Sequence, residues 1–121
     1  MIKKAIIKLF DKLGYRLSRA PDTLRLLDYA GYSPESIKNK RFYNVGAGSF
    51  FHPYWTNIDF VSDWYSKVQT NVVHYDLMKL EPLPINPSTA EIIYTSHTIE
   101  HVSEDAVRNL FREAFKALKQ G

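Results

Sequence analysis

The chain has 121 residues, of which 45% are hydrophobic and 24% are charged, and its net charge is +3. This composition excludes a disordered chain and a coiled coil, and the length predicts one small domain. No run of 18 apolar residues occurs, so we expect no transmembrane helix. Cysteine is absent, which excludes disulfides, thiolate nucleophiles and cysteine-ligated metals, and we expect a reducing, cytoplasmic setting.

The basic residues concentrate at the beginning of the sequence. Residues 1–20 hold six Lys and Arg and one Asp, a net charge of +5, so the other 101 residues sum to −2. A mildly acidic body is atypical of nucleic-acid-binding proteins, and we expect no nucleic-acid partner. Apolar residues at helical spacing predict an amphipathic helix over 2–19. We expect it to pack on the rest of the chain. Weak peripheral contact with a membrane surface through residues 1–19 is the alternative.

The segment before residue 41 is predicted to be helical. Two short helices are expected after the first, one over 22–30 and one from Ser33-Pro34 toward Lys40. Short apolar runs begin after Arg41. We therefore divide the chain into a helical N-terminal arm, 1–40, and an α/β body, 41–121.

Four short apolar runs in the body predict strands. They are expected over 42–45, 55–60, 71–76 and 91–96, and the proline-rich segment 80–89 is expected to be an irregular loop. A final helix is expected after Ser103, which can cap it. Right-handed crossovers between parallel strands then predict a Rossmann-like α/β fold with strand order 3-2-1-4.

Glycines or an acid lie at the carboxyl ends of three of these strands. Gly46 and Gly48 follow the first, Asp59 closes the second and Asp76 closes the third. The carboxyl ends of parallel strands meet at one edge, where open α/β sheets bind ligands. Glycines let the backbone approach a ligand closely, and a carboxylate can accept hydrogen bonds from two ribose hydroxyls. Ordinary turn glycines and solvated turn acids are the alternative interpretation.

The fourth strand leads into His-Thr-Ile-Glu-His at 97–101. This matches the inverted zinc-protease pattern and would predict a zinc-dependent hydrolase in which His97 and His101 bind the metal. Only about one helical turn fits between Ser96 and the cap at Ser103, whereas the pattern needs a helix, so we expect no metal. Polar loop residues beside a pocket, or a non-catalytic interaction module, are further alternatives.

Five segments, 43–48, 57–59, 73–77, 82–84 and 91–102, together resemble class I S-adenosylmethionine-dependent methyltransferases. The similarity is to the compact predicted methyltransferases of glycan and cell-surface biosynthesis, and it covers residues 41–121. It implies S-adenosylmethionine as cofactor and methyl transfer to a small-molecule or glycan acceptor. It also implies a sheet of seven strands. Because only four are found, we expect this chain to be an N-terminal fragment that carries the cofactor-binding half and is inactive alone.

The resemblance also implies roles for individual residues. Gly46 and Gly48 would lie under the methionine part of the cofactor, and Asp59 would bind the ribose. Asp76 and the backbone of Leu77 would face the adenine.

The fourth strand supplies the remaining implied roles. Ser96 and His97 would line the cofactor. If the acceptor is a hydroxyl, His97 and His101 are the candidate bases, because a neutral imidazole can take a proton near pH 7. Two positions depart from the family pattern: Asn44 replaces the usual acid and Phe50 the third glycine.

Overall fold

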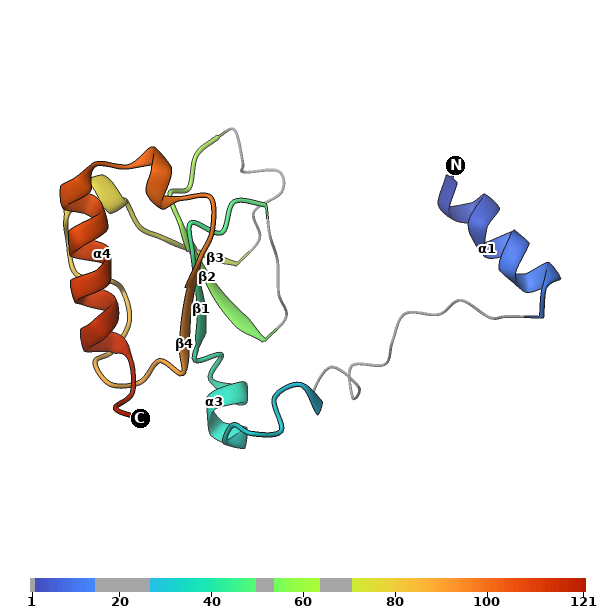
Figure 1. Cartoon of the computed structure of the whole chain (residues 1–121), viewed down its shortest axis with the longest axis horizontal. Coiled ribbons are helices and arrows are strands. Elements are labelled where there is room, and N and C mark those ends of the chain that lie inside the picture. Colours follow the sequence, from blue (N-terminus) through green and yellow to red (C-terminus); the bar gives the residue numbers. More distant parts are fainter. Residues whose placement is uncertain (1, 15–26, 50–53, 64–70) are drawn as a thin grey trace. The chain divides into compact units, whose positions relative to one another are not determined.

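The computed structural model describes residues 2–14, 27–49, 54–63 and 71–121. It divides into two compact units, Met1–Gly31 and Tyr32–Gly121 (Figure 1). The predicted boundary near residue 40 lies inside the second unit, which includes helix α3 (Pro34–Lys38). In the described ranges, no helix has both the length and the apolar character needed to cross a membrane.

The first unit contains helix α1, Ile2–Lys12. The prediction of a helix is confirmed up to Lys12, but the predicted extent to residue 19 is wrong at residues 13 and 14, where the chain turns. Gly14 has a φ of +78°, the left-handed conformation in which many helices end. Residues 15–19 and most of the helix predicted over 22–30 lie outside the described residues. The packing of α1 on the body stays a prediction.

The second unit is built on a parallel sheet of four strands in the order β3-β2-β1-β4. This confirms the predicted Rossmann-like α/β fold and its strand order. The strands are β1 (Phe42–Val45), β2 (Trp55–Asp59), β3 (Val72–His74) and β4 (Ile92–Thr95).

The last three strands are shorter than predicted, and β3 differs most. The Tyr75 N–H donates a hydrogen bond to the Asp59 carbonyl at 2.9 Å, although Tyr75 lies beyond the end of β3. The chain then enters a short 3-10 helix, η1 (Leu77–Lys79), which Asp76 caps. Asp76 is therefore a capping residue just beyond β3.

The connection between β1 and β2 is short for parallel neighbours. Nine residues, 46–54, join the two strands, whereas a parallel crossover usually takes a dozen or more. The Gly46 N–H donates to the Ile58 carbonyl at 2.9 Å, so the turn begins directly against the neighbouring strand. Gly46 and Gly48 have φ values of +73° and +56°, which glycine adopts without a Cβ penalty.

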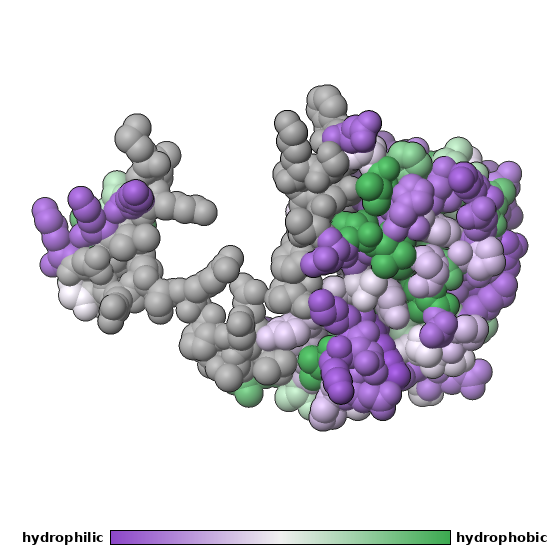
Figure 2. Space-filling view, turned by 180° about the vertical axis from the view of Figure 1, so that it is seen from behind, coloured by the Kyte–Doolittle hydropathy of each residue, from purple (hydrophilic) through white to green (hydrophobic). Residues whose placement is uncertain are grey.

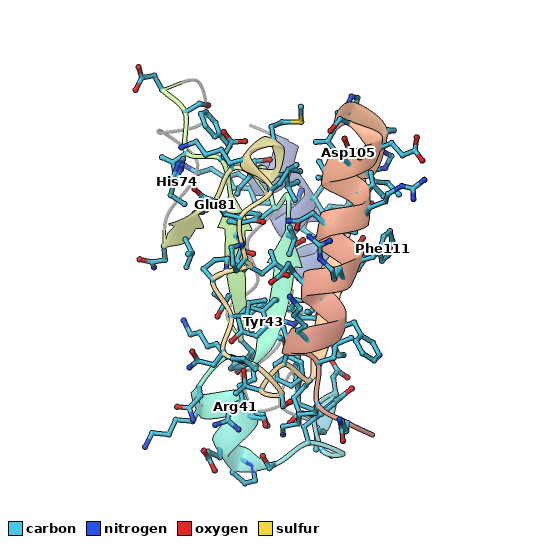
Figure 3. The ribbon with its side chains drawn as sticks, turned by 90° about the vertical axis from the view of Figure 1, so that its left-hand side faces the viewer. Arg41, Tyr43, His74, Glu81, Asp105 and Phe111 are labelled. Atoms are coloured by element: carbon cyan, nitrogen blue, oxygen red, sulfur yellow. The ribbon has the colours of Figure 1, made fainter. Side chains whose placement is uncertain are left out.

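Helix α4, Glu104–Ala117, covers one face of the sheet (Figures 1 and 3). Ser103 begins it as predicted, because its hydroxyl accepts a hydrogen bond from the Ala106 N–H at 3.2 Å. Leu110 lies in the core, and burying a leucine contributes about 1.5–3 kcal/mol. Phe111 lies on the outer side of the helix. Five buried residues form a hydrophobic core cluster: Val45, Ile58, Tyr75, Leu83 and Leu110.

The amino end of the sheet carries a polar cluster formed by Ser36, Glu91 and Lys119. The Glu91 carboxylate accepts hydrogen bonds from the Ser36 hydroxyl and the Lys119 ammonium group. Ser36 comes from α3, Glu91 precedes β4 and Lys119 follows α4, so this amino-end cluster ties three segments together. Just beside it, Leu118 pairs with Ala90 in a parallel bridge.

Candidate functional site

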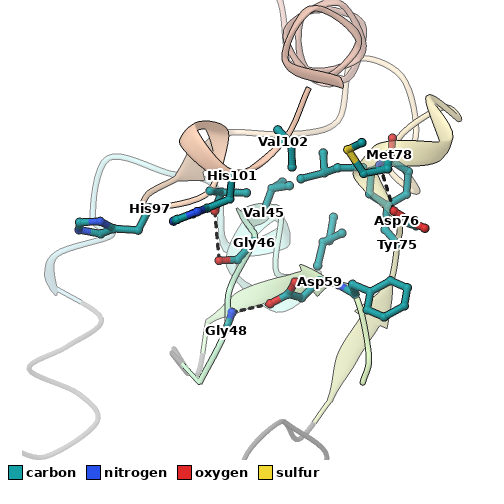
Figure 4. A pocket seen from close by; sticks show the side chains of 14 residues that line it. Val45, Gly46, Gly48, Asp59, Tyr75, Asp76, Met78, His97, His101 and Val102 are labelled. Atoms are coloured by element: carbon teal, nitrogen blue, oxygen red, sulfur yellow. Dashed lines mark hydrogen bonds between the residues drawn. The ribbon is translucent and has the colours of Figure 1, made fainter. Parts of the chain in front are cut away.

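A cavity of about 530 Å³ lies at the carboxyl ends of the strands (Figure 4). Its volume falls in the range of small-molecule sites. Its lining comes from the segments that follow all four strands, as expected for an open α/β sheet. The lining residues are Val45, Gly46, Gly48, Ile58, Asp59, Phe60, Tyr75, Asp76, Leu77, Met78, His97, Thr98, His101 and Val102.

The cavity brings together seven of the eight residues that the sequence singled out. These are Gly46, Gly48, Asp59, Asp76, Leu77, His97 and His101. Ser96 is exposed and does not line the cavity; its carbonyl accepts a hydrogen bond from the Thr98 hydroxyl at 3.1 Å. Asn44 is buried and does not line it either. Phe50 lies outside the described residues.

Thr98 lies over the glycine turn. Its hydroxyl donates to the Gly46 carbonyl at 3.5 Å, and a Cβ on Gly46 would lie 2.1 Å from the Thr98 hydroxyl oxygen. Gly46 is therefore required by a contact within the protein as well as by its positive φ. Among the described residues, nothing lies within 4 Å of a Cβ at Gly48, and its φ of +56° favours glycine there. The sequence indicated both glycines but not Thr98.

Asp59 links the end of β2 to the glycine turn. One carboxylate oxygen, Oδ2, accepts a hydrogen bond from the Gly48 N–H at 2.5 Å. The other, Oδ1, accepts from the Phe60 N–H at 2.7 Å. Asp59 therefore holds the turn and lines the cavity at the same time. These two backbone bonds fix the direction in which the carboxylate faces.

Asp76 and Leu77 border the cavity where η1 begins. The Asp76 Oδ1 atom accepts a hydrogen bond from the Met78 N–H at 3.0 Å, which fixes the side chain at the cap position. Asp76 is half-buried and has its second oxygen, Oδ2, for further donors. Capping thus holds a second carboxylate at the cavity, on the side where Figure 4 shows Tyr75 and Asp76.

Apolar and aromatic side chains complete the lining, and the sequence did not indicate them. Tyr75 is buried, and its hydroxyl donates to the Glu81 carbonyl at 2.6 Å. Burial, followed by the charges of Glu113 and Glu81, raises the pKa of Tyr75 above its usual value, so it stays neutral. Phe60 and Met78 are more than half exposed although they line the cavity, which makes its rim apolar.

Phe60 is positioned by His74. The two rings lie 5.2 Å apart between centroids, and the His74 Nδ1 atom accepts a hydrogen bond from the Val61 N–H at 3.0 Å. An acceptor Nδ1 requires the neutral ring to carry its proton on Nε2. The alternation of side chains along β3 does not by itself predict that His74 positions Phe60.

His97 and His101 do not lie on one helix. His97 has a φ of +52°, and a 3-10 helix, η2 (Ile99–His101), begins after it. Glu100 lies between the two rings, with its Oε1 atom 3.5 Å from His97 Nδ1 and 4.0 Å from His101 Nε2. In Figure 4, His101 lies beside Gly46, and His97 lies at the outer margin of the cavity.

This geometry differs from that of the zinc-protease pattern, which presents both imidazoles from one helix face. Across the described residues, no three His, Asp or Glu side chains are grouped so that they could hold a metal ion.

The charge of the lining is acidic. Asp59 and Asp76 are carboxylates, and no Lys or Arg occurs among the described lining residues. An acidic wall favours a neutral or cationic ligand over a phosphate-rich one, because like charges repel.

Comparisons of the chain with protein-family models, with curated proteins and with solved structures give no match. The functional argument therefore depends on the geometry and chemistry of the cavity.

Proposed function

We propose that the cavity binds S-adenosylmethionine and that the protein takes part in methyl transfer to a small-molecule or glycan acceptor. The observation that carries the proposal is the placement of Asp59. Its carboxylate is tied to the glycine turn through Gly48 and borders the cavity at the end of β2. An acid at the end of the second strand of an open α/β sheet can accept hydrogen bonds from two ribose hydroxyls.

The remaining lining supports a nucleoside without phosphates. Asp76 and the Leu77 backbone offer polar groups at the adenine end implied by the sequence resemblance, and Tyr75 and Met78 offer apolar surface. The described lining has no cation for a pyrophosphate, and the nine-residue link after β1 leaves little room for a phosphate-binding helix. These features argue against a dinucleotide.

When bound, S-adenosylmethionine supplies an electrophilic methyl group on a positively charged sulfur. The carboxylates of Asp59 and Asp76 favour that charge in the cavity. For a hydroxyl acceptor, the imidazole of His101 is the better placed of the two histidines to take a proton, because it lies beside Gly46. The lack of cysteine fits a reducing, cytoplasmic setting for this reaction.

Calorimetric titration of the full chain with S-adenosylhomocysteine tests the proposal, with NAD as the comparison ligand. We expect S-adenosylhomocysteine to bind and NAD to bind at least tenfold more weakly. In Asp59→Asn, one oxygen remains for the Gly48 N–H but the charge is lost, so we expect affinity to fall about tenfold. Losing charge-assisted hydrogen bonds costs about 1.5–3 kcal/mol, and each 1.4 kcal/mol is a factor of ten.

Asp105→Asn is the matched control, because Asp105 is exposed in the first turn of α4 and does not line the cavity. Its affinity should equal that of the wild type. Absence of S-adenosylhomocysteine binding by the folded chain, or unchanged affinity in a folded Asp59→Asn variant, would overturn the assignment.

A further inference from the structure

Helix α1 separates its apolar and basic residues. Ile6, Leu9 and Leu13 fall within an arc of about 60° when successive residues are turned by 100°. Lys4, Lys8 and Lys12 follow one another every fourth residue, on a stripe beside that arc. Figure 2 shows hydrophilic side chains in a row on this helix. The helix therefore has one apolar and one cationic surface.

The apolar surface of α1 is exposed in the first unit. Ile6, Leu9 and Leu13 are 44%, 57% and 62% exposed. A helix of 11 residues is only marginally stable in water by itself, and most helices gain their stability by burying an apolar face. α1 therefore needs an apolar surface on which to pack.

The lysines of α1 indicate what that surface is. In the described part of the chain, Lys4, Lys8 and Lys12 form no ion pair with a carboxylate. Among the described lysines of the second unit, Lys116 pairs with Glu113 and Lys119 pairs with Glu91, whereas Lys38, Lys40 and Lys79 form no such pair. A partner for α1 should therefore offer many negative charges next to apolar surface. An anionic lipid bilayer offers both, with headgroups above and acyl chains below.

We propose that α1 binds an anionic membrane surface, lying in the plane of the headgroups with Ile6, Leu9 and Leu13 inserted and the lysines facing lipid phosphates. Its length is about 16 Å at 1.5 Å per residue, about half of the roughly 30 Å hydrocarbon thickness, so it lies on the membrane and does not cross it. The role is independent of the cavity, and it would bring the protein to membrane-bound acceptors.

Sedimentation of the full chain with vesicles tests this proposal. The vesicles contain phosphatidylcholine alone or mixed equally with phosphatidylglycerol. We expect binding to the mixed vesicles at low salt and at least tenfold weaker binding to phosphatidylcholine alone. Leu9→Glu should weaken binding to mixed vesicles at least tenfold. Lys4→Gln, Lys8→Gln and Lys12→Gln combined should weaken it on the order of a hundredfold, since each lysine near an anionic surface contributes about a factor of five.

Phe111→Glu is the matched control, because it introduces the same charge at an exposed apolar position of another helix. Its vesicle binding should equal that of the wild type. Equal affinity for both vesicle types, or no loss in Leu9→Glu, would overturn the proposal. So would the absence of vesicle binding, which would favour packing of α1 on the α/β unit. Nucleic acid is another partner that presents phosphates to the lysines, and fluorescence anisotropy with a labelled oligonucleotide tests it. Salt-sensitive binding of the oligonucleotide without vesicle binding would also overturn the proposal.

Discussion

The two ends of the parallel sheet use similar polar residues in different ways. At the amino end, the Glu91 carboxylate is bonded to the Ser36 hydroxyl and the Lys119 ammonium group, and its side chain is only 14% exposed. At the carboxyl end, the Asp59 carboxylate accepts hydrogen bonds from the backbone N–H groups of Gly48 and Phe60, and it borders a cavity.

The difference shows how to distinguish a structural acid from a ligand-binding acid in a small α/β fold. A carboxylate that a cation neutralises within the protein contributes to stability and has little left to offer a ligand. A carboxylate that backbone N–H groups orient at the edge of a cavity faces the space that a ligand would occupy. Variants at the two ends should therefore separate stability from binding.

The largest expected effect is that of Gly46→Val. The new side chain would overlap Thr98 and would have to adopt a φ of +73°. Left-handed strain costs about 1–2 kcal/mol and overpacking about 1–3 kcal/mol, so we expect the free energy of unfolding to fall by about 2–5 kcal/mol in urea denaturation. Thr98 occupies the space that the valine side chain would need. The variant therefore loses stability through a clash within the protein, and not only affinity through a blocked ligand site.

Gly48→Ala is the control for backbone strain alone, since a Cβ there meets no neighbour. Its loss should be about 1–2 kcal/mol. If Gly46→Val and Gly48→Ala were equally destabilised, the contact with Thr98 would not matter. Adding Thr98→Gly to Gly46→Val should recover part of the lost stability.

The second effect is that of Glu91→Ala at the amino end. Ser36 and Lys119 would lose their shared acceptor, but Lys119 is 36% exposed and can regain water. We therefore expect the free energy of unfolding to fall by about 1–2 kcal/mol, with unchanged affinity for S-adenosylhomocysteine. A loss of affinity with unchanged stability would contradict the division of roles between the two ends.

The third effect concerns pH. The hydrogen bonds from Lys119 and then Ser36 lower the pKa of Glu91 below its usual 4.5. Because the folded pKa is the lower one, the stabilisation is complete above about pH 4.5 and is lost as the pH falls through the lowered value. In urea denaturation at several pH values, the stability difference between the wild type and Glu91→Gln should therefore shrink below pH 4.5. A difference that stayed constant down to pH 2 would show that Glu91 is not the titrating group.

The smallest effect is expected for His101→Gln. His101 is 75% exposed and we propose that it faces the acceptor and not the cofactor, so S-adenosylhomocysteine should bind within about twofold of wild-type affinity, well below the tenfold step of 1.4 kcal/mol. Calorimetry on the variant measures this. A tenfold loss would instead place His101 among the cofactor contacts.

Local patterns in the sequence predicted the sheet and half of the residues that line the cavity. Strand order followed from apolar runs and crossover handedness, and Gly46, Gly48, Asp59 and Asp76 were found because each lies at or just beyond the end of a strand. The end of α1 at Lys12 was not predicted, because apolar residues recur at helical spacing beyond that point.

Tertiary contacts could not be predicted in the same way. Thr98 lies 52 residues from Gly46, and Lys119 lies 83 residues from Ser36. No periodicity within one segment encodes such pairs. The sequence resemblance implied that Ser96 would line the cofactor; in the structure Ser96 does not line the cavity, and the chain takes a positive φ at the next residue, His97.

The sheet order has a consequence for how the protein folds. Phe42 pairs with Trp55, and Asn57 with Val72, so the paired residues of β1 and β2 lie 13 apart in the sequence and those of β2 and β3 lie 15 apart. Phe42 pairs with Ile92 across 50 residues. Because longer loops close at a greater entropic cost and non-local pairing is slow, we expect β1–β3 to assemble first and β4 with α4 to dock later. The side of the cavity formed by Asp59 would then exist before the side formed by His97 and His101, and the complete cavity would be among the last features to form.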